Sequence, residues 1–338
     1  MIFDDVQKIL SDTTKNDLII ISNSVLNQFQ TGLNIGGHIL KDCQNENPID
    51  FLAYCYEFIN SLNITRIIAV GGGSIMDLAK IISATSSLDD LLNNKTAKKY
   101  HLTVVPTTFA TGSETSAGAI YKSKDGIKQG VRGEEIVPDE VLYDPKIFLS
   151  LNDRLQKESF FDLFTHAFET GLSQKATEGV RTNSIGIIDQ LIQWYKEEKL
   201  SVQTMTDSDL KILCHLSYIS GLNLKLSSTC SPHRIQYVSS PKNNLNHSTG
   251  LFDIYYRWFP KVENYLENLA EHNQFSYYIK ENVEEIKRFI NYFELTNPIF
   301  YSEAEIKDMV ANIDENRLKN DPVTNTLTEI MDLLKVLN

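Results

Sequence analysis

The sequence predicts an α/β domain with a largely parallel sheet over residues 1–150, followed by an all-α domain over residues 151–338. Three observations predict this division. Short, apolar, β-branched runs alternate with helical patterns in the first part. From about Leu151 onward the apolar residues recur with a period near 3.6, which is typical of helices. The 338 residues are also enough to build two hydrophobic cores.

In the first part, short apolar runs bounded by polar turns predict buried strands. These predicted strands cover residues 17–22, 38–41, 66–70, 102–105 and 141–145. Helices are predicted between the strands at residues 24–31 and 49–62, the second after the break at Asn47-Pro48. Residues 118–122, followed by Lys124-Asp-Gly126, predict a hairpin.

A glycine cluster directly follows the strand predicted at residues 66–70. Residues 71–80 read GGGSIMDLAK, so a strand leads through three glycines into a helix. This arrangement points backbone N–H groups and a helix N-terminus at a phosphate group. The run is not the G-x-G-x-x-G dinucleotide fingerprint, and an ordinary turn is the alternative interpretation.

A second loop, residues 106–114, follows the strand predicted at 102–105 and reads PTTFATGSE. Its hydroxyl groups and small side chains suit hydrogen bonding to a ribose, an amide or a phosphate. The alternative is an ordinary polar loop before a helix, with Ser113 or Thr115 as the helix cap.

The second part reads as a series of amphipathic helices. They are predicted at residues 154–172, 183–198, 208–222, 280–292, 303–313 and 326–337. Ser302 and Glu305 have the spacing of a capping box at the start of one of them.

Four residues of the second part have side chains that bind metals. Asp162 and His166 are four residues apart in a predicted helix and therefore share one face. His233 and His247 lie further along the chain. One carboxylate and three imidazoles suit a divalent cation such as Fe2+ or Zn2+. A solvated Asp–His pair on a helix surface is the alternative interpretation of the first two.

The composition excludes several classes of partner. A formal net charge of −12 argues against nucleic acid and against anionic membrane surfaces. Four cysteines without C-x-x-C spacing fit reduced thiols in a cytoplasmic enzyme better than a disulfide framework. The N-terminus lacks the pattern of a signal peptide, and no apolar run is long enough to span a bilayer. We therefore expect a cytoplasmic protein.

In chain order, the motifs VGGGSIMDLAK, PTTFATGSE, PDEVLYDP, FFDLFTHAFE and the two later histidines resemble the iron-containing (group III) alcohol dehydrogenase family. The resemblance covers most of residues 15–250. It implies a dehydroquinate-synthase-like fold, in which the α/β domain binds a dinucleotide and the helical domain binds a metal. It also implies NAD or NADP as cofactor, one divalent metal (Fe2+ or Zn2+), a small-molecule aldehyde or alcohol as substrate, and a homodimer.

Site residues carry over position by position from this resemblance. In the α/β domain, the cofactor-binding positions that match are Gly71, Gly72, Gly73, Ser74, Asp77, Thr107, Thr108, Thr111 and Lys128. The glycine run matches the pyrophosphate-binding turn, the threonines match the loop that flanks adenosine and nicotinamide, and Lys128 resembles a lysine that contacts the cofactor ribose. The metal-ligand positions that match are Asp162, His166, His233 and His247.

Three positions depart from the family pattern. Asn23 takes the place of an aspartate that pairs with the ribose 2′-OH of NAD, and loss of that carboxylate removes the repulsion toward a 2′-phosphate. Tyr237 replaces a histidine implicated in proton relay, so it is the candidate catalytic residue here; a pocket wall is its alternative role. Ser248 stands where glycine is typical.

The segment STCSPHRIQY is similar to the branch of the family that includes phosphonoacetaldehyde reductases. A phosphonate or another anionic group needs a local basic pocket in so acidic a protein. Arg132 and Arg234 are the candidates for gripping it, and solvated surface arginines are the alternative interpretation.

The sequence thus predicts a metal-dependent, NAD(P)-linked oxidoreductase that interconverts a small aldehyde and its alcohol by direct hydride transfer. Phosphonoacetaldehyde or another anionic aldehyde is the candidate substrate. The alternatives are a dehydroquinate-synthase-like cyclase, which is a lyase, a glycerol-1-phosphate-type dehydrogenase, and a binding module that keeps the fold without turnover.

Overall fold

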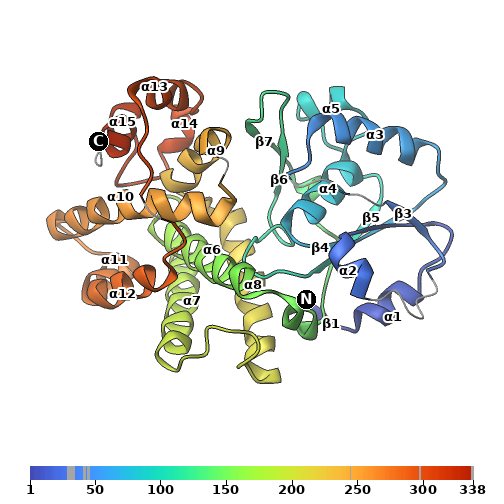
Figure 1. The fold of residues 1–338 in the computed structure, drawn as a ribbon, viewed down its shortest axis with the longest axis horizontal. Helices are drawn as coiled ribbons and strands as arrows, with labels where there is room; N and C mark the ends of the chain where they lie inside the picture. The colour runs from blue at the N-terminus through green and yellow to red at the C-terminus, as the bar shows by residue number, and fades with distance from the viewer. Residues whose placement is uncertain (29–34, 41–42, 44–45, 244, 297, 336–338) are drawn as a thin grey trace. The chain divides into compact units, whose positions relative to one another are not determined.

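A computed structural model of the 338-residue chain describes residues 1–28, 35–40, 43, 46–243, 245–296 and 298–335 (Figure 1). The contacts divide the chain into two compact units. Unit 1 consists of Met1–Leu151 together with Thr206–Lys225, and unit 2 consists of Asn152–Met205 and Leu226–Asn338. The sequence predicted one boundary after residue 150; the contacts place a boundary after Leu151 and assign a later helical segment to unit 1.

Unit 1 contains a parallel sheet. Within the described residues it has six strands in the order β1-β8-β5-β4-β2-β3, and every neighbouring pair is parallel (Figure 1). Its central strands are almost wholly apolar because helices cover a parallel sheet on both faces. The strands are β1 (Ile2–Phe3), β2 (Asp17–Ile21), β3 (His38–Leu40), β4 (Arg66–Gly71), β5 (His101–Pro106) and β8 (Glu140–Tyr143).

The rest of unit 1 consists of short helices and a hairpin. Strands β6 (Gly118–Lys122) and β7 (Lys128–Arg132) pair antiparallel. The helices are α1 (Val6–Ser11), α2 (Asn23–Gln28), α3 (Ile49–Asn60), α4 (Gly73–Ala84) and α5 (Leu88–Leu92), with 3-10 turns at Glu134–Ile136 and Pro145–Ser150.

Helix α4 packs against β4, β5 and β6 and is fixed by a buried lysine. Lys80 is fully enclosed, and its Nζ donates to the Ser113 carbonyl at 2.9 Å, to the Ser116 hydroxyl at 3.1 Å and to the Gly118 carbonyl. Burial lowers the pKa of Lys80 to about 8, although the negative charge of Asp77 acts to raise it. This lysine ties the helix to the loop that precedes the hairpin.

Helix α8 (Asp207–Ser227) lies late in the chain, yet most of it belongs to unit 1. The Ser217 hydroxyl donates to the Glu114 carboxylate at 2.7 Å and accepts from the Ala110 N–H at 3.0 Å. Tyr143 donates to the same carboxylate at 2.8 Å. These buried contacts hold the loop between β5 and β6 from both sides, and one of its residues, Ala110, has a positive φ of 92°.

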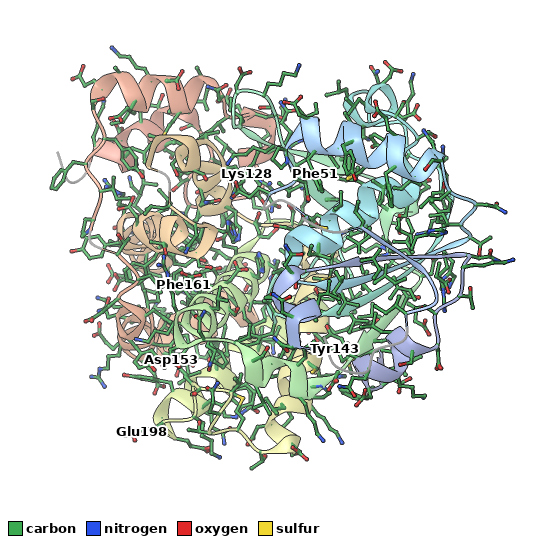
Figure 2. All side chains as sticks on the ribbon, turned by 45° about the vertical axis from the view of Figure 1, so that its right-hand side comes forward. Phe51, Lys128, Tyr143, Asp153, Phe161 and Glu198 are labelled. Atoms are coloured by element: carbon green, nitrogen blue, oxygen red, sulfur yellow. The ribbon has the colours of Figure 1, made fainter. Side chains whose placement is uncertain are left out.

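Unit 2 is helical. Its helices are α6 (Asp153–Leu172), α7 (Glu178–Lys196), α9 (Ser231–Asn243), α10 (His247–Asn268), α11 (Gln274–Glu281), α12 (Val283–Phe293), α13 (Glu303–Ala311), α14 (Glu315–Leu318) and α15 (Leu327–Lys335). An aromatic core joins α6 to its neighbours: Phe161, labelled in Figure 2, lies 5.6 Å from Tyr255, and Phe164 lies 5.3 Å from Phe289, ring centre to ring centre. Such edge-to-face contacts stabilise a core beyond simple burial.

The predicted fold class is confirmed, and the predicted strands and hairpin all form. The predicted segments 29–31, Lys41 and 336–337 lie outside the described residues. The sequence did not predict β1, α1, α5, α9, α10 or α14, and the single helix predicted at residues 280–292 is two helices, α11 and α12, that meet at Asn282. No helix in the described part of the chain has the length and apolarity needed to cross a membrane.

Candidate functional site

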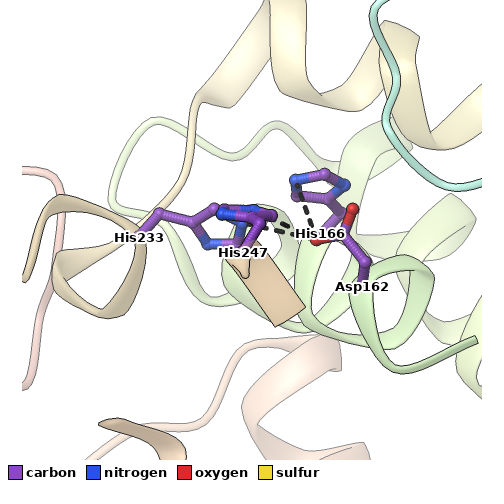
Figure 3. Close-up of side chains that lie close together, drawn as sticks. All are labelled: Asp162, His166, His233 and His247. Atoms are coloured by element: carbon purple, nitrogen blue, oxygen red, sulfur yellow. Dashed lines mark ion pairs between the residues drawn. The ribbon is translucent and has the colours of Figure 1, made fainter. Parts of the chain in front are cut away.

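The structure brings together in unit 2 the four side chains that were predicted to bind a metal (Figure 3). Asp162 and His166 come from α6, His233 from α9, and His247 is the first residue of α10. The Asp162 Oδ1 lies 3.7 Å from the Nε2 of His166, 3.8 Å from that of His233 and 3.4 Å from that of His247. One donor atom from each side chain can be chosen so that all four lie within 4.8 Å of one another.

Helix caps position the two later histidines. Asn246 caps α10 by accepting from the Thr249 N–H at 2.9 Å, and its amide also donates to Glu158 of α6 at 2.6 Å. Asp321 accepts from the N–H of Ser231, the first residue of α9, at 3.0 Å, and from its hydroxyl. The helices that carry His233 and His247 therefore each begin at a residue that is hydrogen-bonded to another segment of unit 2.

Two residues that were not predicted orient the imidazoles. The Nδ1 of His233 donates to the buried Glu169 carboxylate at 2.7 Å, and the Nδ1 of His247 donates to the Gln236 amide oxygen at 2.8 Å. With the proton on Nδ1, a neutral imidazole keeps its Nε2 lone pair, which here faces Asp162.

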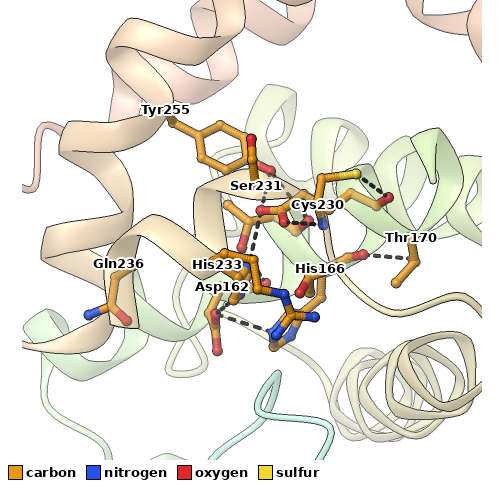
Figure 4. A network of polar contacts seen from close by, with 12 residues as sticks. Asp162, His166, Thr170, Cys230, Ser231, His233, Gln236 and Tyr255 are labelled. Carbon is orange, nitrogen blue, oxygen red and sulfur yellow. Dashed lines mark hydrogen bonds and ion pairs between the residues drawn. The ribbon is translucent and has the colours of Figure 1, made fainter. Parts of the chain in front are cut away.

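Glu169 is itself held within a network that includes Cys230, His233 and Tyr255 (Figure 4). The Cys230 N–H donates to it at 2.8 Å and the Tyr255 hydroxyl at 3.1 Å. Spacing was the available signal for both orienting residues. Glu169 is three residues after His166 on α6, and Gln236 is three residues after His233 on α9, so each lies on the face of a ligand.

The charges of the cluster support one another. Burial raises the pKa of the Asp162 carboxyl, but the charges of His166 and His247 outweigh it and hold this pKa well below its usual range. For His233, burial lowers the pKa while the charge of Glu169 raises it, with a net value of about 9, so a metal that binds Nε2 displaces a proton from it near neutral pH.

Two buried atoms of the cluster, the Asp162 Oδ1 and the His233 Nε2, have no hydrogen-bond partner. Buried polar atoms without partners are costly, and both of these can donate an electron pair to a cation. The donor set of one carboxylate and three imidazoles therefore fits a divalent metal.

In unit 1, the glycine turn and the threonine loop lie next to each other. A Cβ atom on Gly72 would lie 3.1 Å from the Thr108 Oγ1, and one on Gly73 would lie 3.2 Å from the Thr111 Cβ. The Thr108 hydroxyl is buried and has no hydrogen-bond partner. Thr107 is also buried, and its N–H donates to the Gly71 carbonyl at 3.1 Å. Backbone N–H groups and threonine hydroxyls thus gather at one edge of the sheet.

The same edge carries Asn23. Strand β2 pairs with β4 up to Ile21 and Val70, and Asn23 begins helix α2 just beyond. In parallel α/β sheets, ligands bind beyond the carboxyl ends of the strands, which is where Asn23 and the glycine turn lie.

Three predicted cofactor-binding residues make contacts within the protein. The Asp77 carboxylate accepts from the Ser113 hydroxyl and from the Ile120 N–H at 2.9 Å, so its oxygens connect α4 to the loop and to β6. The Ser74 hydroxyl accepts from the Glu46 N–H at 3.2 Å. The Lys128 Nζ forms an ion pair with Glu46 at 2.8 Å.

The remaining predicted residues occupy different units. Tyr237 lies on α9, with its ring centre 6.2 Å from that of His247. Arg234 is buried on the same helix, next to His233 in sequence. Arg132 ends β7 in unit 1, where its backbone pairs with the side chain of Asn94.

Comparison with known proteins by sequence gives matches to parts of the chain. Residues 2–145 match the family described as iron-containing alcohol dehydrogenase. The chain is 26% identical over 223 residues to the long-chain-alcohol dehydrogenase 1 of Geobacillus thermodenitrificans, a match that covers 62% of this chain and 55% of that protein. Other curated relatives match over 27–43% of their own lengths.

Solved structures match over nearly the whole chain. An iron-containing alcohol dehydrogenase of Thermotoga maritima has a TM-score of 0.80 at 19% identity, covering 98% of this chain and 95% of that one. A sulfoacetaldehyde reductase of Bifidobacterium kashiwanohense, solved in complex with NAD+, has a TM-score of 0.78 at 16% identity, with the same coverage. At these identities the structural likeness establishes the fold.

Proposed function

We propose that the chain is a metal-dependent, NAD(P)-linked oxidoreductase of the iron-containing alcohol dehydrogenase family, whose model matches residues 2–145. It interconverts a small aldehyde and its alcohol, and reduction adds one hydride and one proton to the carbonyl group. The observation that carries this proposal is the cluster of Asp162, His166, His233 and His247, whose donor atoms lie within 4.8 Å of one another.

These four side chains would hold the metal, and the glycine turn with its threonines would hold the dinucleotide. When bound, the divalent cation supplies Lewis acidity toward a carbonyl oxygen and the nicotinamide supplies the hydride. The Asp162 carboxylate offsets part of the positive charge of the cluster. Glu169 and Gln236 fix the tautomers and ring directions of two histidines, so little reorganisation is needed when the site is loaded.

The chain also supplies candidates for binding the cofactor phosphates and for transferring the proton. The N–H groups at the start of α4 provide donors for a pyrophosphate, and the glycines allow it to approach the backbone. The Tyr237 hydroxyl is our candidate for the proton transfer, because its ring lies beside His247. Asn23 carries no charge, so we propose that NADP is accepted as well as NAD.

An anionic aldehyde is the proposed substrate class. A chain with a net charge of −12 repels small anions unless a basic residue lies in the site, and unit 2 has one buried next to a metal-ligand position. One of the proteins that share the fold is a reductase of sulfoacetaldehyde, whose sulfonate is anionic. Homodimerisation and a cytoplasmic location stay predictions.

The test is an activity assay on metal-stripped protein reloaded with Fe2+ or Zn2+. NADPH or NADH is mixed with a panel of aldehydes, including phosphonoacetaldehyde, and the absorbance of the reduced cofactor is followed. We expect metal-dependent consumption of the cofactor. Turnover of a seven-carbon sugar phosphate without net cofactor change would instead identify a cyclase. Reduction of only a phosphorylated ketone would identify a glycerol-1-phosphate-type dehydrogenase, and silence with every substrate would leave a binding module.

A further inference from the structure

Arg234 is a buried cation without a carboxylate partner in the part of the chain that the structure describes. The residue is 8% exposed and lies in the first turn of α9. Its Nη2 donates to the Ser228 hydroxyl at 2.8 Å, and its Nε has no hydrogen-bond partner. Among the described residues, no carboxylate forms an ion pair with it. Burying an unpaired charge costs several kcal/mol, so such a group normally has a partner.

A second buried arginine in the same unit shows how the protein neutralises such a charge for structural purposes. Arg257 is 2% exposed and forms an ion pair with Asp253 at 3.4 Å, one turn earlier on α10. The Nη1 of Arg257 donates to the Leu334 carbonyl at 3.0 Å. Arg257 thus connects segments of unit 2 and carries a carboxylate for its charge. The Nε of Arg257, like that of Arg234, has no hydrogen-bond partner, so the two arginines differ in the group that faces the charge: Arg234 has one neutral hydroxyl where Arg257 has a carboxylate.

The position of Arg234 relates it to the candidate metal site. Its guanidinium carbon lies 6.0 Å from the centre of the Tyr237 ring, and that ring centre lies 6.2 Å from the centre of the His247 ring. Tyr237 and His233 are four residues apart on α9 and therefore share a face. The Tyr237 ring thus lies near both the guanidinium and one residue of the ligand cluster. A substrate with its carbonyl group at the cluster would need only a short chain to bring a second group toward Arg234.

We infer that Arg234 binds the anionic group of the substrate and makes the enzyme selective for small aldehydes that carry a phosphonate, sulfonate or carboxylate at the end remote from the carbonyl. This inference rests on the proposed function. A guanidinium binds such oxyanions through paired hydrogen bonds. The Ser228 hydroxyl accepts from Nη2 and fixes the side chain, while the buried Nε has no hydrogen-bond partner.

The experiment compares Arg234→Met, Arg234→Lys and the matched surface variant Arg317→Met. The kcat/KM of each protein is measured for phosphonoacetaldehyde, sulfoacetaldehyde, succinic semialdehyde and the neutral propionaldehyde. In Arg234→Met the ratio of kcat/KM for the preferred anionic aldehyde to that for propionaldehyde should fall by at least about 30-fold, since truncating one partner of a buried charge pair is costly. Arg234→Lys should retain part of this ratio, and Arg317→Met should retain all of it. The preferred aldehyde of the three identifies the oxyanion.

A binding measurement provides a second readout that needs no turnover. Phosphonoacetate, sulfoacetate and succinate are titrated calorimetrically into the wild type and Arg234→Met, with thermal unfolding and metal content as checks that the variant folds. The dissociation constant of the preferred anion should rise by at least about tenfold in the variant. An unchanged ratio of kcat/KM in a folded variant, or a rise in the KM of the dinucleotide alone, would overturn the role of Arg234 while leaving the reductase intact. A wild-type protein that reduces no aldehyde would overturn both proposals.

Discussion

The candidate sites of the two units are built from different parts of the chain. In unit 1, backbone N–H groups, glycines and threonine hydroxyls form the edge of a parallel sheet. In unit 2, four chemically specific side chains converge, and further residues orient them. A backbone site depends on the space left open, whereas a side-chain site depends on each donor atom. We therefore expect substitutions to have graded effects in unit 1 and near-complete effects in unit 2.

Asp162→Asn should have the largest effect. The amide keeps the shape of the side chain but removes the negative charge that the three imidazoles surround. We expect loss of bound metal and a fall of at least about 10³-fold in kcat. Metal analysis by mass spectrometry and steady-state kinetics measure both. The exposed Asp332→Asn is the control. If Asp162→Asn keeps its metal, the expected near-complete effect of substitutions in unit 2 is wrong.

Lys80→Met tests the packing that supports unit 1 through the pH dependence of stability. The pKa of Lys80 is lowered to about 8 in the folded chain, so between pH 8 and about 10.5 the unfolded chain binds more protons. The free energy of unfolding should gain roughly 3 kcal/mol from this group as the pH rises through that window. Urea unfolding at pH 7.5 and pH 10.5 measures the gain.

Lys80→Met should lack this part of the pH dependence, and the exposed Lys175→Met should keep it. If the free energies of unfolding of the wild type and of Lys80→Met change by the same amount between the two pH values, Lys80 does not titrate as the structure implies.

Glu169→Gln tests whether the carboxylate that orients His233 supports metal binding in unit 2. The substitution keeps an oxygen at the Oε1 position, where it accepts from His233 and Tyr255, but removes the charge and places an NH2 group at the Oε2 position, where it faces the Cys230 N–H. We expect the metal affinity to fall about 10- to 100-fold, as for other residues that orient a metal-bound histidine. Competition with a chelator measures the affinity. Glu178→Gln, on the exposed start of α7, is the control; equal affinities would show that Glu169 serves packing alone.

Gly72→Ala should have the smallest effect. The new Cβ would lie 3.1 Å from the Thr108 Oγ1, a tight distance that a small shift of the hydroxyl can relieve. We expect about a tenfold rise in the KM of the dinucleotide, with a stability change within about 1 kcal/mol. Gly186→Ala on α7, where a Cβ meets nothing within 4 Å, should leave that KM unchanged. An unchanged KM of the dinucleotide in Gly72→Ala would show that the glycine turn does not bind the dinucleotide.

Much of unit 1 could be predicted because its strands are short apolar runs with clear ends. Strands β4 and β5 each lead into a loop of small or hydroxyl-bearing residues, and both patterns are local in sequence. Strand β1 was missed because it has only two residues, and its pairing with β8 joins distant parts of the chain. The assignment of α8 to unit 1 was missed for the same reason: it depends on contacts such as that of Ser217 with Glu114.

In unit 2, residue types and family resemblance predicted the four clustered side chains, but not the helices that carry His233 and His247. The segment of α9 mixes apolar and polar residues without a clear amphipathic period and contains Pro232 and Pro241, so its helix depends on tertiary contacts such as that of Asp321 with Ser231. Glu169 looks like any acidic residue on a helix until the fold brings His233 to it. Side-chain partners from distant segments cannot be derived from local patterns.

The most direct test of the account is X-ray absorption spectroscopy on protein loaded with Zn2+ or Fe2+, together with the metal content per chain. We expect one metal per chain, coordinated by three imidazole nitrogens and at least one oxygen, with Zn–N distances of about 2.0–2.1 Å. His247→Ala should lose one imidazole from the spectrum along with most of the metal, whereas the exposed His215→Ala should change neither. A metal content in His247→Ala equal to that of the wild type, with an unchanged spectrum, would contradict the assignment of the metal site.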